Sequence, residues 1–276
     1  MSISYKKTHI GEHPLKADSL MMGYGYDPQL SEGSIKCPNF QTSTFVFKSA
    51  EQGKDFFNLV SGRRQLKDGE QAGLVYSRFN NPTLEIAENR IAIWDQAEDC
   101  IVTGSGMSAI STTLFTFSRP GDVVVYSEPI YGGTDTLVNV VLKQMNIQSV
   151  GYLSSEGSLG LKQALDKAKA LGSISVVMLE TPDNPTNNLI DIAECKKIID
   201  DATIDQASKP VLAIDNTMMG PVWQQPLAHG ADLCIYSLTK YVGGHSDLIG
   251  GSCSGSKALV SRIRKVRNSI GTTMDS

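Results

Sequence analysis

Residues 211–240 read VLAIDNTMMGPVWQQPLAHGADLCIYSLTK, and this stretch holds two short apolar segments that each lead into polar residues. PVLAID (210–215) and ADLCIYS (231–237) are aliphatic and have the length of buried strands. The first ends at Asp215, and the second is followed closely by Lys240. A carboxylate at the end of an apolar strand is costly to bury alone, so Asp215 is a helix cap, half of a buried ion pair, or a group that binds a cationic ring nitrogen or a metal.

The same alternation of strand and helix patterns extends from about residue 84 to the end of the chain. We expect strands in CIVTGSG (100–106), DVVVYS (122–127) and ISVVMLE (174–180), in addition to the two above. We expect helices over residues 84–94, 107–118, 136–145, 161–172, 192–202 and 256–268. Strands rich in β-branched residues that alternate with helices predict an α/β fold, with a mostly parallel sheet and helices on both faces.

Ligands of such sheets bind at the carboxyl ends of the strands. Asp215 and Lys240 follow successive strands, so we expect both at this edge. The other polar groups expected there are Gly104–Gly106, Tyr131, Glu180–Asn184, Asn216 and Ser237–Thr239.

GSGMSA (104–109) follows a strand and opens a helix, where free backbone amides favour a phosphate. It also fits the GxGxxA fingerprint of dinucleotide sites, and Glu128 stands where a ribose-binding acid belongs. The motif alone therefore leaves three interpretations open: a nicotinamide or flavin site, another phosphate site, or a plain tight turn.

Pyridoxal phosphate (PLP) needs a lysine for a Schiff base, a carboxylate for its ring nitrogen, a phosphate cradle and a ring to stack on. Lys240 and Asp215 are candidates for the first two. The remaining candidates are the amides of Gly106 and Met107, the hydroxyls of Ser237 and Thr239, and the ring of Tyr131. A dinucleotide enzyme would explain GSGMSA but not the arrangement of Asp215 and Lys240.

Tyr76 and Arg78 alternate in VYSRFNNP (75–82) and would share one face if this stretch is extended. An arginine fork and a tyrosine hydroxyl suit a phosphate. The alternative is a solvated loop arginine.

Composition narrows the class of protein. The chain of 276 residues has a net charge of −4, which argues against nucleic acid as a partner. The five scattered cysteines contain no CxxC pair, so we expect reduced thiols, no metal site and a cytoplasmic location. We expect no signal peptide and no membrane span. The basic residues of the last helix, Lys257, Arg262, Arg264, Lys265 and Arg267, are expected to form a solvated face.

Residues 1–75 lack sustained periodicity and are expected to form an irregular N-terminal arm. MMGYGYDP (21–28) and SGRRQLKDGEQAG (61–73) are typical of loops. An arm of this length is hard to place inside a monomer's core, so we expect it to contact a second subunit.

Several segments, in order, resemble the Cys/Met-metabolism PLP-dependent enzymes. They include YSRFNNPT (76–83), GSGMSAI (104–110), ETPDNPT (180–186), the segment 213–251 around SLTKYVGGHSD, and RNSIGTTMDS (267–276). The resemblance implies a fold-type I large domain over residues 76–276. It also implies PLP as cofactor and a homotetramer in which Tyr76 and Arg78 reach the neighbouring subunit's cofactor.

The resemblance further implies residue roles, with Lys240 as the Schiff-base lysine, Asp215 as the partner of the ring nitrogen and Tyr131 as the stacking ring. Gly106, Met107, Ser237 and Thr239 would hold the phosphate, and Asn184 would lie near the 3-hydroxyl. Members of the family continue into a C-terminal domain that supplies the arginine for the substrate carboxylate, so we expect this chain to be a fragment.

The activity implied is γ-elimination or γ-replacement on a sulfur amino acid or an activated homoserine, as in methionine γ-lyases and cystathionine γ-synthases. The alternative within the family is a cystathionine β- or γ-lyase. Gly133 stands where methionine γ-lyases often have cysteine and cystathionine enzymes often have glycine. A NAD or flavin oxidoreductase that uses GSGMSA, a fold-type I aminotransferase and a catalytically inactive PLP-binding fragment stay open as other classes.

Overall fold

The computed structural model describes residues 5–65, 67 and 73–276. Its contacts divide the chain into two compact units, Met1–Arg90 with Asp275–Ser276 and Ile91–Met274. Part of the predicted loop SGRRQLKDGEQAG, residues 66 and 68–72, lies outside the described residues.

The second unit is built on one sheet with the strand order β3-β9-β8-β7-β6-β4-β5. Its strands are β3 (Asp99–Thr103), β4 (Val123–Glu128), β5 (Gln148–Leu153), β6 (Ile174–Glu180), β7 (Val211–Asp215), β8 (Leu233–Ser237) and β9 (Gly251–Gly255). The pairs from β8 to β5 are parallel, whereas β9 is antiparallel to both of its neighbours. The predicted mostly parallel sheet is therefore confirmed.

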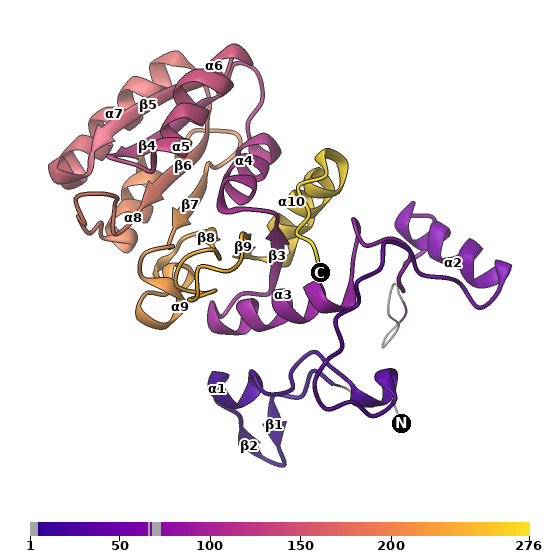
Figure 1. The fold of residues 1–276 in the computed structure, drawn as a ribbon. Coiled ribbons are helices and arrows are strands. Elements are labelled where there is room, and N and C mark those ends of the chain that lie inside the picture. The colour runs from indigo at the N-terminus through magenta and orange to yellow at the C-terminus, as the bar shows by residue number, and fades with distance from the viewer. Residues whose placement is uncertain (1–4, 66, 68–72) are drawn as a thin grey trace. The chain divides into compact units, whose positions relative to one another are not determined.

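Helices cover both faces of this sheet (Figure 1). One face packs against α4 (Gly106–Phe117) and α10 (Lys257–Ile270), and the other packs against α7 (Gly157–Leu171) and α8 (Ile192–Ala202). The shorter helical segments are α5 (Gly132–Thr136), the π-helical turn η2 (Leu137–Val141), α6 (Leu142–Gln144), η3 (Ser154–Glu156), α9 (Gly220–Trp223) and η4 (Pro226–His229).

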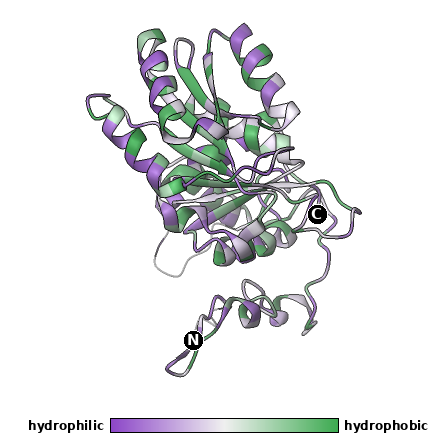
Figure 2. Ribbon diagram, turned by 90° about the vertical axis from the view of Figure 1, so that its left-hand side faces the viewer, coloured by the Kyte–Doolittle hydropathy of each residue, from purple (hydrophilic) through white to green (hydrophobic). Residues whose placement is uncertain are grey.

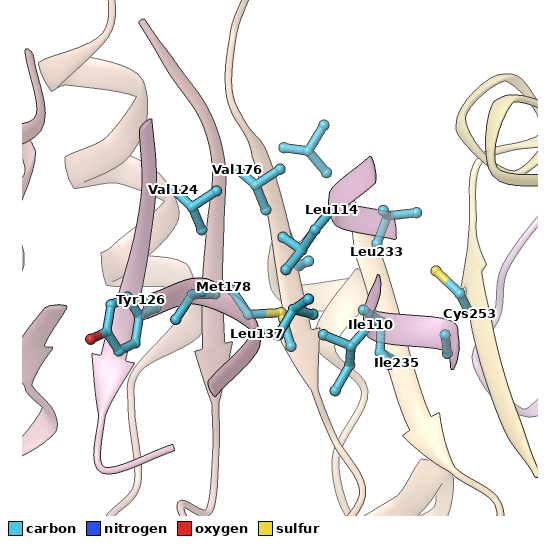
Figure 3. Close-up of a cluster of buried hydrophobic side chains, with 14 of the residues drawn as sticks. Ile110, Leu114, Val124, Tyr126, Leu137, Val176, Met178, Leu233, Ile235 and Cys253 are labelled. Carbon is cyan, nitrogen blue, oxygen red and sulfur yellow. The ribbon is translucent and has the colours of Figure 1, made fainter. Parts of the chain in front are cut away.

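Alternate residues of each central strand pack into two hydrophobic cores, one on each face of the sheet. In β4, Val124 and Tyr126 face the side of α4, whereas Val123 and Val125 face the side of α7. This is the period of two expected for a strand that is buried on both faces. Figure 2 shows strands of the sheet that are mainly hydrophobic, while the helices carry one hydrophobic and one hydrophilic side. Figure 3 shows Ile110 and Leu114 of α4 among the side chains of the first core.

Two strands of the sheet were missed by the sequence analysis. β9 has the sequence GSCSG, in which glycine and serine give no hydrophobic signal. It is nevertheless fully buried, because β3 and β8 cover its edges and a helix covers its face. β5 is a half-buried edge strand, whose sequence QSVGYL contains few aliphatic residues.

The first unit contains regular elements that the prediction of an irregular arm did not include. They are β1 (His9–Ile10), β2 (His13–Pro14), α1 (Ala17–Leu20), η1 (Pro28–Ser31) and α2 (Ala50–Val60). The unit also contains the first part of α3 (Pro82–Trp94), which was predicted as a helix over residues 84–94. The hydroxyl of Ser49 caps α2 by accepting the N–H of Gln52 at 3.2 Å. Phe56 of this helix is buried in ring contacts with Phe47 and Phe57. The apolar residues of α2 gather near its end, so the sequence shows no sustained helical period.

The last helix is less solvated than predicted. Arg267 of α10 is 2% exposed, and its Nη1 donates to the carbonyl of Val102 at 3.0 Å. Arg264 is half-buried and pairs with Asp99 at 2.9 Å. The expectation of a solvated basic face is therefore wrong for these two arginines, because α10 packs with one side against β3.

No helix in the described part of the chain is long and apolar enough to cross a membrane.

Candidate functional site

Asp215 and Lys240 lie at the same edge of the sheet, as predicted. Asp215 is the last residue of β7, which pairs in parallel with β8, and Lys240 follows in the turn after β8. The Lys240 N–H donates to the carbonyl of Ser237 at 3.2 Å, and its side chain is exposed. Asp215 is 7% exposed. The edge thus combines an accessible amine with a buried carboxylate.

Thr217 joins the two strand ends. Its hydroxyl donates to Oδ1 of Asp215 at 2.6 Å and accepts the N–H of Ser237 at 2.8 Å. The Thr217 N–H also donates to Asp215, at 3.0 Å. Burial raises the pKa of Asp215, and these two hydrogen bonds from Thr217 oppose that rise. A positive group beside the carboxyl would favour its ionised form in the same way.

The N-terminus of α4 abuts Ser237. An ideal Cβ placed on Gly106 would lie 2.7 Å from Cβ of Ser237, so glycine alone permits this approach. The hydroxyl of Ser105 caps the helix by accepting the N–H of Ser108 at 3.0 Å. The amides of Gly106 and Met107 therefore open a 12-residue helix beside the hydroxyl of Ser237, an arrangement suited to an anion.

A cavity of about 800 Å³ opens beside Lys240. Its lining includes Thr239 and Asn184, which brings together three of the predicted site residues. The hydroxyl of Thr239 accepts the N–H of Gly250 at 3.1 Å and donates to its carbonyl at 3.3 Å. Asp215 and Tyr131 are not among the residues that line this cavity.

Tyr131 and Met107 lie on either side of Gly133. An ideal Cβ on Gly133 would be 2.8 Å from Cε1 of Tyr131 and 2.9 Å from Sδ of Met107. Tyr131 directly precedes α5, and its side chain is half-exposed at 47%. The aromatic ring is thus accessible, and together with Met107 it occupies the space that a side chain at position 133 would need.

Glu180 links two of these segments. It ends β6, is 4% exposed, and its carboxyl accepts the N–H of Tyr131 at 2.6 Å. Burial, followed by the charge of Asp215, raises its pKa to about 8, and the backbone N–H groups of Tyr131 and Asn184 oppose this rise. The sequence marked Glu180 as a strand-end residue without assigning it a role.

Tyr76 and Arg78 belong to the first unit. The segment is a turn rather than an extended strand, because the N–H of Phe79 donates to the carbonyl of Tyr76 at 2.9 Å. The Arg78 guanidinium lies 4.5 Å from the ring centroid of Phe79 and 5.7 Å from that of Tyr76. The condition for a shared extended face is therefore not met, and the role of the pair toward a phosphate stays a prediction.

The strand order contradicts the dinucleotide interpretation of GSGMSA. That fingerprint needs the strand before the glycines and the strand with the acid to be neighbours in one βαβ unit. Here β3 and β4 are separated by β9, β8, β7 and β6. Five strand spacings correspond to about 24 Å, too far for Glu128 to reach a ribose at Gly106. Glu128 instead accepts the hydroxyl of Tyr126 at 2.8 Å.

Two residues of the site carried a signal that the sequence analysis passed over. Thr217 stands two residues after Asp215 in the motif DNT, the spacing at which an aspartate bonds to the following backbone. Gly251 packs so closely on the Ser105 carbonyl that no side chain fits there. The sequence signal was the glycine pair 250–251, because glycine in a strand often indicates a close approach of another backbone.

Comparisons with known proteins point to one family. The family model described as "Cys/Met metabolism PLP-dependent enzyme" matches residues 18–276. An L-methionine gamma-lyase of Fusobacterium nucleatum subsp. polymorphum is 35% identical over 259 residues, which cover 94% of this chain and 58% of that protein. The chain thus spans less than two thirds of that relative's length.

Solved structures of similar fold carry related names. A cystathionine gamma synthase of Xanthomonas oryzae has a TM-score of 0.78 at 27% identity, covering 95% of this chain and 60% of that one. An O-acetylhomoserine (thiol)-lyase of Campylobacter jejuni has a TM-score of 0.75 at 28% identity, covering 90% of this chain and 56% of that one. The latter structure contains a pyridoxyl-lysine monophosphate. The predicted fold class is confirmed by these matches.

Proposed function

The chain belongs to the Cys/Met metabolism PLP-dependent enzyme family, and on this premise we propose that it takes part in γ-elimination or γ-replacement on a sulfur amino acid or an activated homoserine. One observation carries the proposal. Asp215 ends β7, and Lys240 follows the adjacent parallel strand β8. The hydroxyl of Thr217 bonds both to Asp215 and to the backbone N–H of Ser237, three residues before Lys240. A buried anion beside an accessible amine is what PLP requires.

The other residues at this edge fit the same cofactor. The amides that open α4 and the hydroxyl of Ser237 would hold its phosphate, and the side chain of Thr239 would join them. The half-exposed ring of Tyr131 would stack on the pyridine, and Asn184 would lie near its 3-hydroxyl. The tight approach of Gly106 to Ser237 supports this assignment, because it brings the start of α4 and the Ser237 hydroxyl to the same place.

When bound, PLP would supply an electron sink that acidifies the α-carbon of an amino acid. Asp215 would keep the ring nitrogen protonated, because a cationic partner offsets the burial that raises the pKa of its carboxyl. Lys240 would hold the cofactor through Nζ. Once released by the substrate amine, Nζ would move protons between the α- and β-carbons. The hydroxyl of Tyr131 would act as its acid–base partner.

Gly133 favours a cystathionine enzyme over a methionine γ-lyase, and a cystathionine β- or γ-lyase is the second candidate. Its contacts with Tyr131 and Met107 mean that any side chain at this position would displace one of them. The size of residue 133 therefore bears directly on the substrate's γ-position, if Tyr131 stacks on the cofactor. The identity to an L-methionine gamma-lyase favours the first candidate.

The proposal extends to assembly and location. We place Tyr76 and Arg78 against the cofactor of a neighbouring subunit in a homotetramer, through the arm over residues 1–75. The PLP-binding large domain is residues 76–276. The five cysteines are all free thiols in the structure, in keeping with the cytoplasm.

The experiment is to purify the chain with and without PLP and to record its visible absorption. A band that borohydride reduces, and that disappears in Lys240→Ala but not in the control Lys265→Ala, is expected. Methionine, cystathionine and an O-acylhomoserine with a thiol are then offered in turn, and 2-oxo acid and thioether products are measured. Binding without turnover would indicate an inactive PLP-binding chain. Steady amino transfer to 2-oxoglutarate would indicate an aminotransferase, and no band would overturn the proposal.

A further inference from the structure

Glu180 occupies a fixed position between the strands that carry the candidate site. Its N–H donates to the buried hydroxyl of Ser127 on β4 at 3.1 Å. The next residue, Thr181, donates its N–H to the carbonyl of Asp215 on β7 at 3.3 Å. Because β4 and β7 both bond to the backbone at this position, the side chain of Glu180 extends from a fixed place at this edge of the sheet.

The carboxyl of Glu180 interacts with backbone N–H groups of two different loops. The Tyr131 N–H has no helical acceptor, since Tyr131 precedes α5, and it donates to Oε2 of Glu180 at 2.6 Å. The backbone N–H of Asn184, in the loop after β6, is near enough to this carboxyl to lower its pKa. A short bond to a carboxyl group that is 4% exposed is strong, because water competes little there.

We propose that Glu180 is a positioning residue of this site, which uses one buried carboxyl to fix Tyr131 and Asn184 relative to Asp215. This inference rests on the proposed function and assigns a role that the motif residues do not cover. Tyr131 and Asn184 are expected on different sides of a bound cofactor ring. Glu180 would therefore fix the positions of both the stacking ring of Tyr131 and the side chain of Asn184 near the 3-hydroxyl.

The charges around Glu180 support the same role. The groups that face it are Asp215 from β7 and Asp183 from the loop after β6. Burial, followed by the charge of Asp215, raises the pKa of Glu180 to about 8, so it is largely protonated at neutral pH. A proton on Glu180 removes the repulsion between the two carboxyl groups, which makes the ionised form of Asp215 less costly beside a cationic ring nitrogen.

Two substitutions and a matched control test the inference. Glu180→Gln keeps one carbonyl oxygen as an acceptor, whereas Glu180→Ala removes both oxygens. Asp95→Asn is the control, because Asp95 is also a buried carboxyl, 2% exposed, which accepts the hydroxyl of Tyr236 at 2.5 Å and does not bond to Tyr131 or Asn184. All three variants lose a buried carboxyl in the same unit.

The first readout needs no cofactor. In the chain without PLP, hydrogen exchange of peptides that cover residues 129–136 and 181–188 should be at least about 10-fold faster in Glu180→Ala than in wild type. Glu180→Gln should be intermediate, and Asp95→Asn should leave both peptides unchanged. Equal protection of both peptides in wild type and Glu180→Ala would overturn the inference.

The second readout is the bound cofactor. Glu180→Ala should weaken PLP binding by about 10- to 100-fold and reduce the circular dichroism of the visible band, which reports ring orientation. Wild-type affinity and circular dichroism in both Glu180 variants would also overturn the inference. A wild-type chain that does not bind PLP would instead overturn the proposed function, and the hydrogen-exchange comparison would still decide whether Glu180 anchors the two loops.

Discussion

Glu180 and Asp215 are partners in the parallel register of β6 and β7, so two buried carboxyl groups end neighbouring strands. A pair of carboxyl groups this close holds one proton more firmly than a lone group does, because both cannot be ionised cheaply. The protonation of this pair therefore affects both the chemistry of the site and the stability of the folded chain at different pH values.

The first prediction concerns that pH dependence. The pKa of Glu180 is raised from 4.5 to about 8, so the folded chain retains a proton that the unfolded chain has lost. Stability without PLP should therefore fall as the pH rises through this window, by on the order of 2–4 kcal/mol. The free energy of unfolding, obtained from urea unfolding at several pH values, measures this loss of stability.

Glu180→Gln is the control for this prediction. Burial also raises the pKa of Asp95, to about 6, so Asp95 lowers the stability in the same way at lower pH. The two proteins are therefore compared above about pH 6. Between about pH 6 and pH 8 the variant should lose much less stability than wild type. An equal slope in both proteins would show that another group carries the effect.

The second prediction concerns the hydroxyl of Thr217. Thr217→Val keeps the shape but removes the oxygen that donates to Asp215 and accepts the N–H of Ser237. We expect a loss of about 1–3 kcal/mol, because a part-buried N–H and a buried carboxylate each lose a partner. PLP affinity should fall as well, since the pKa of Asp215 rises when this bond is lost. Thr217→Ser should retain most of both quantities, and a valine variant equal to wild type would contradict the prediction.

The third prediction concerns the approach of α4 to Ser237. Gly106→Ala would bring a methyl group to 2.7 Å from Cβ and 2.9 Å from Cα of Ser237, so the helix must shift. We expect a cost of about 1–3 kcal/mol and a marked loss of PLP binding. Gly132→Ala is the matched control, because its Cβ would meet nothing within 4 Å. Thermal unfolding of the two variants provides the comparison, and equal midpoints would contradict the prediction.

The fourth prediction concerns the buried arginine of α10. Arg267→Ala should destabilise the second unit by about 3 kcal/mol, because it leaves the carbonyl of Val102 without this donor and opens a cavity. Lys265→Ala, two residues away on the exposed side of the helix, should change stability by less than about 0.5 kcal/mol. Denaturant unfolding distinguishes the two, and similar small losses would contradict the buried role of Arg267.

Local patterns were sufficient to predict most elements of the second unit. The segment ISVVMLE was predicted as a strand and forms β6 over the same residues, and IAECKKIIDDA forms α8. Both carry the periodicity of their own element, so their neighbours are not needed to recognise them. The strand GSCSG was missed, because it is buried by its partners rather than by its own hydrophobicity.

The α/β class and the common edge of Asp215 and Lys240 follow from local sequence, since the end of an apolar strand can be located from neighbouring residues alone. Which strands are neighbours depends on the folded arrangement of the whole sheet. It separates β3 from β4, which removes the dinucleotide interpretation of GSGMSA, and it buries Arg267. It also directs the N–H of Tyr131 to Glu180, 49 positions away. Contacts between residues so far apart depend on sheet order and packing, which no local pattern encodes.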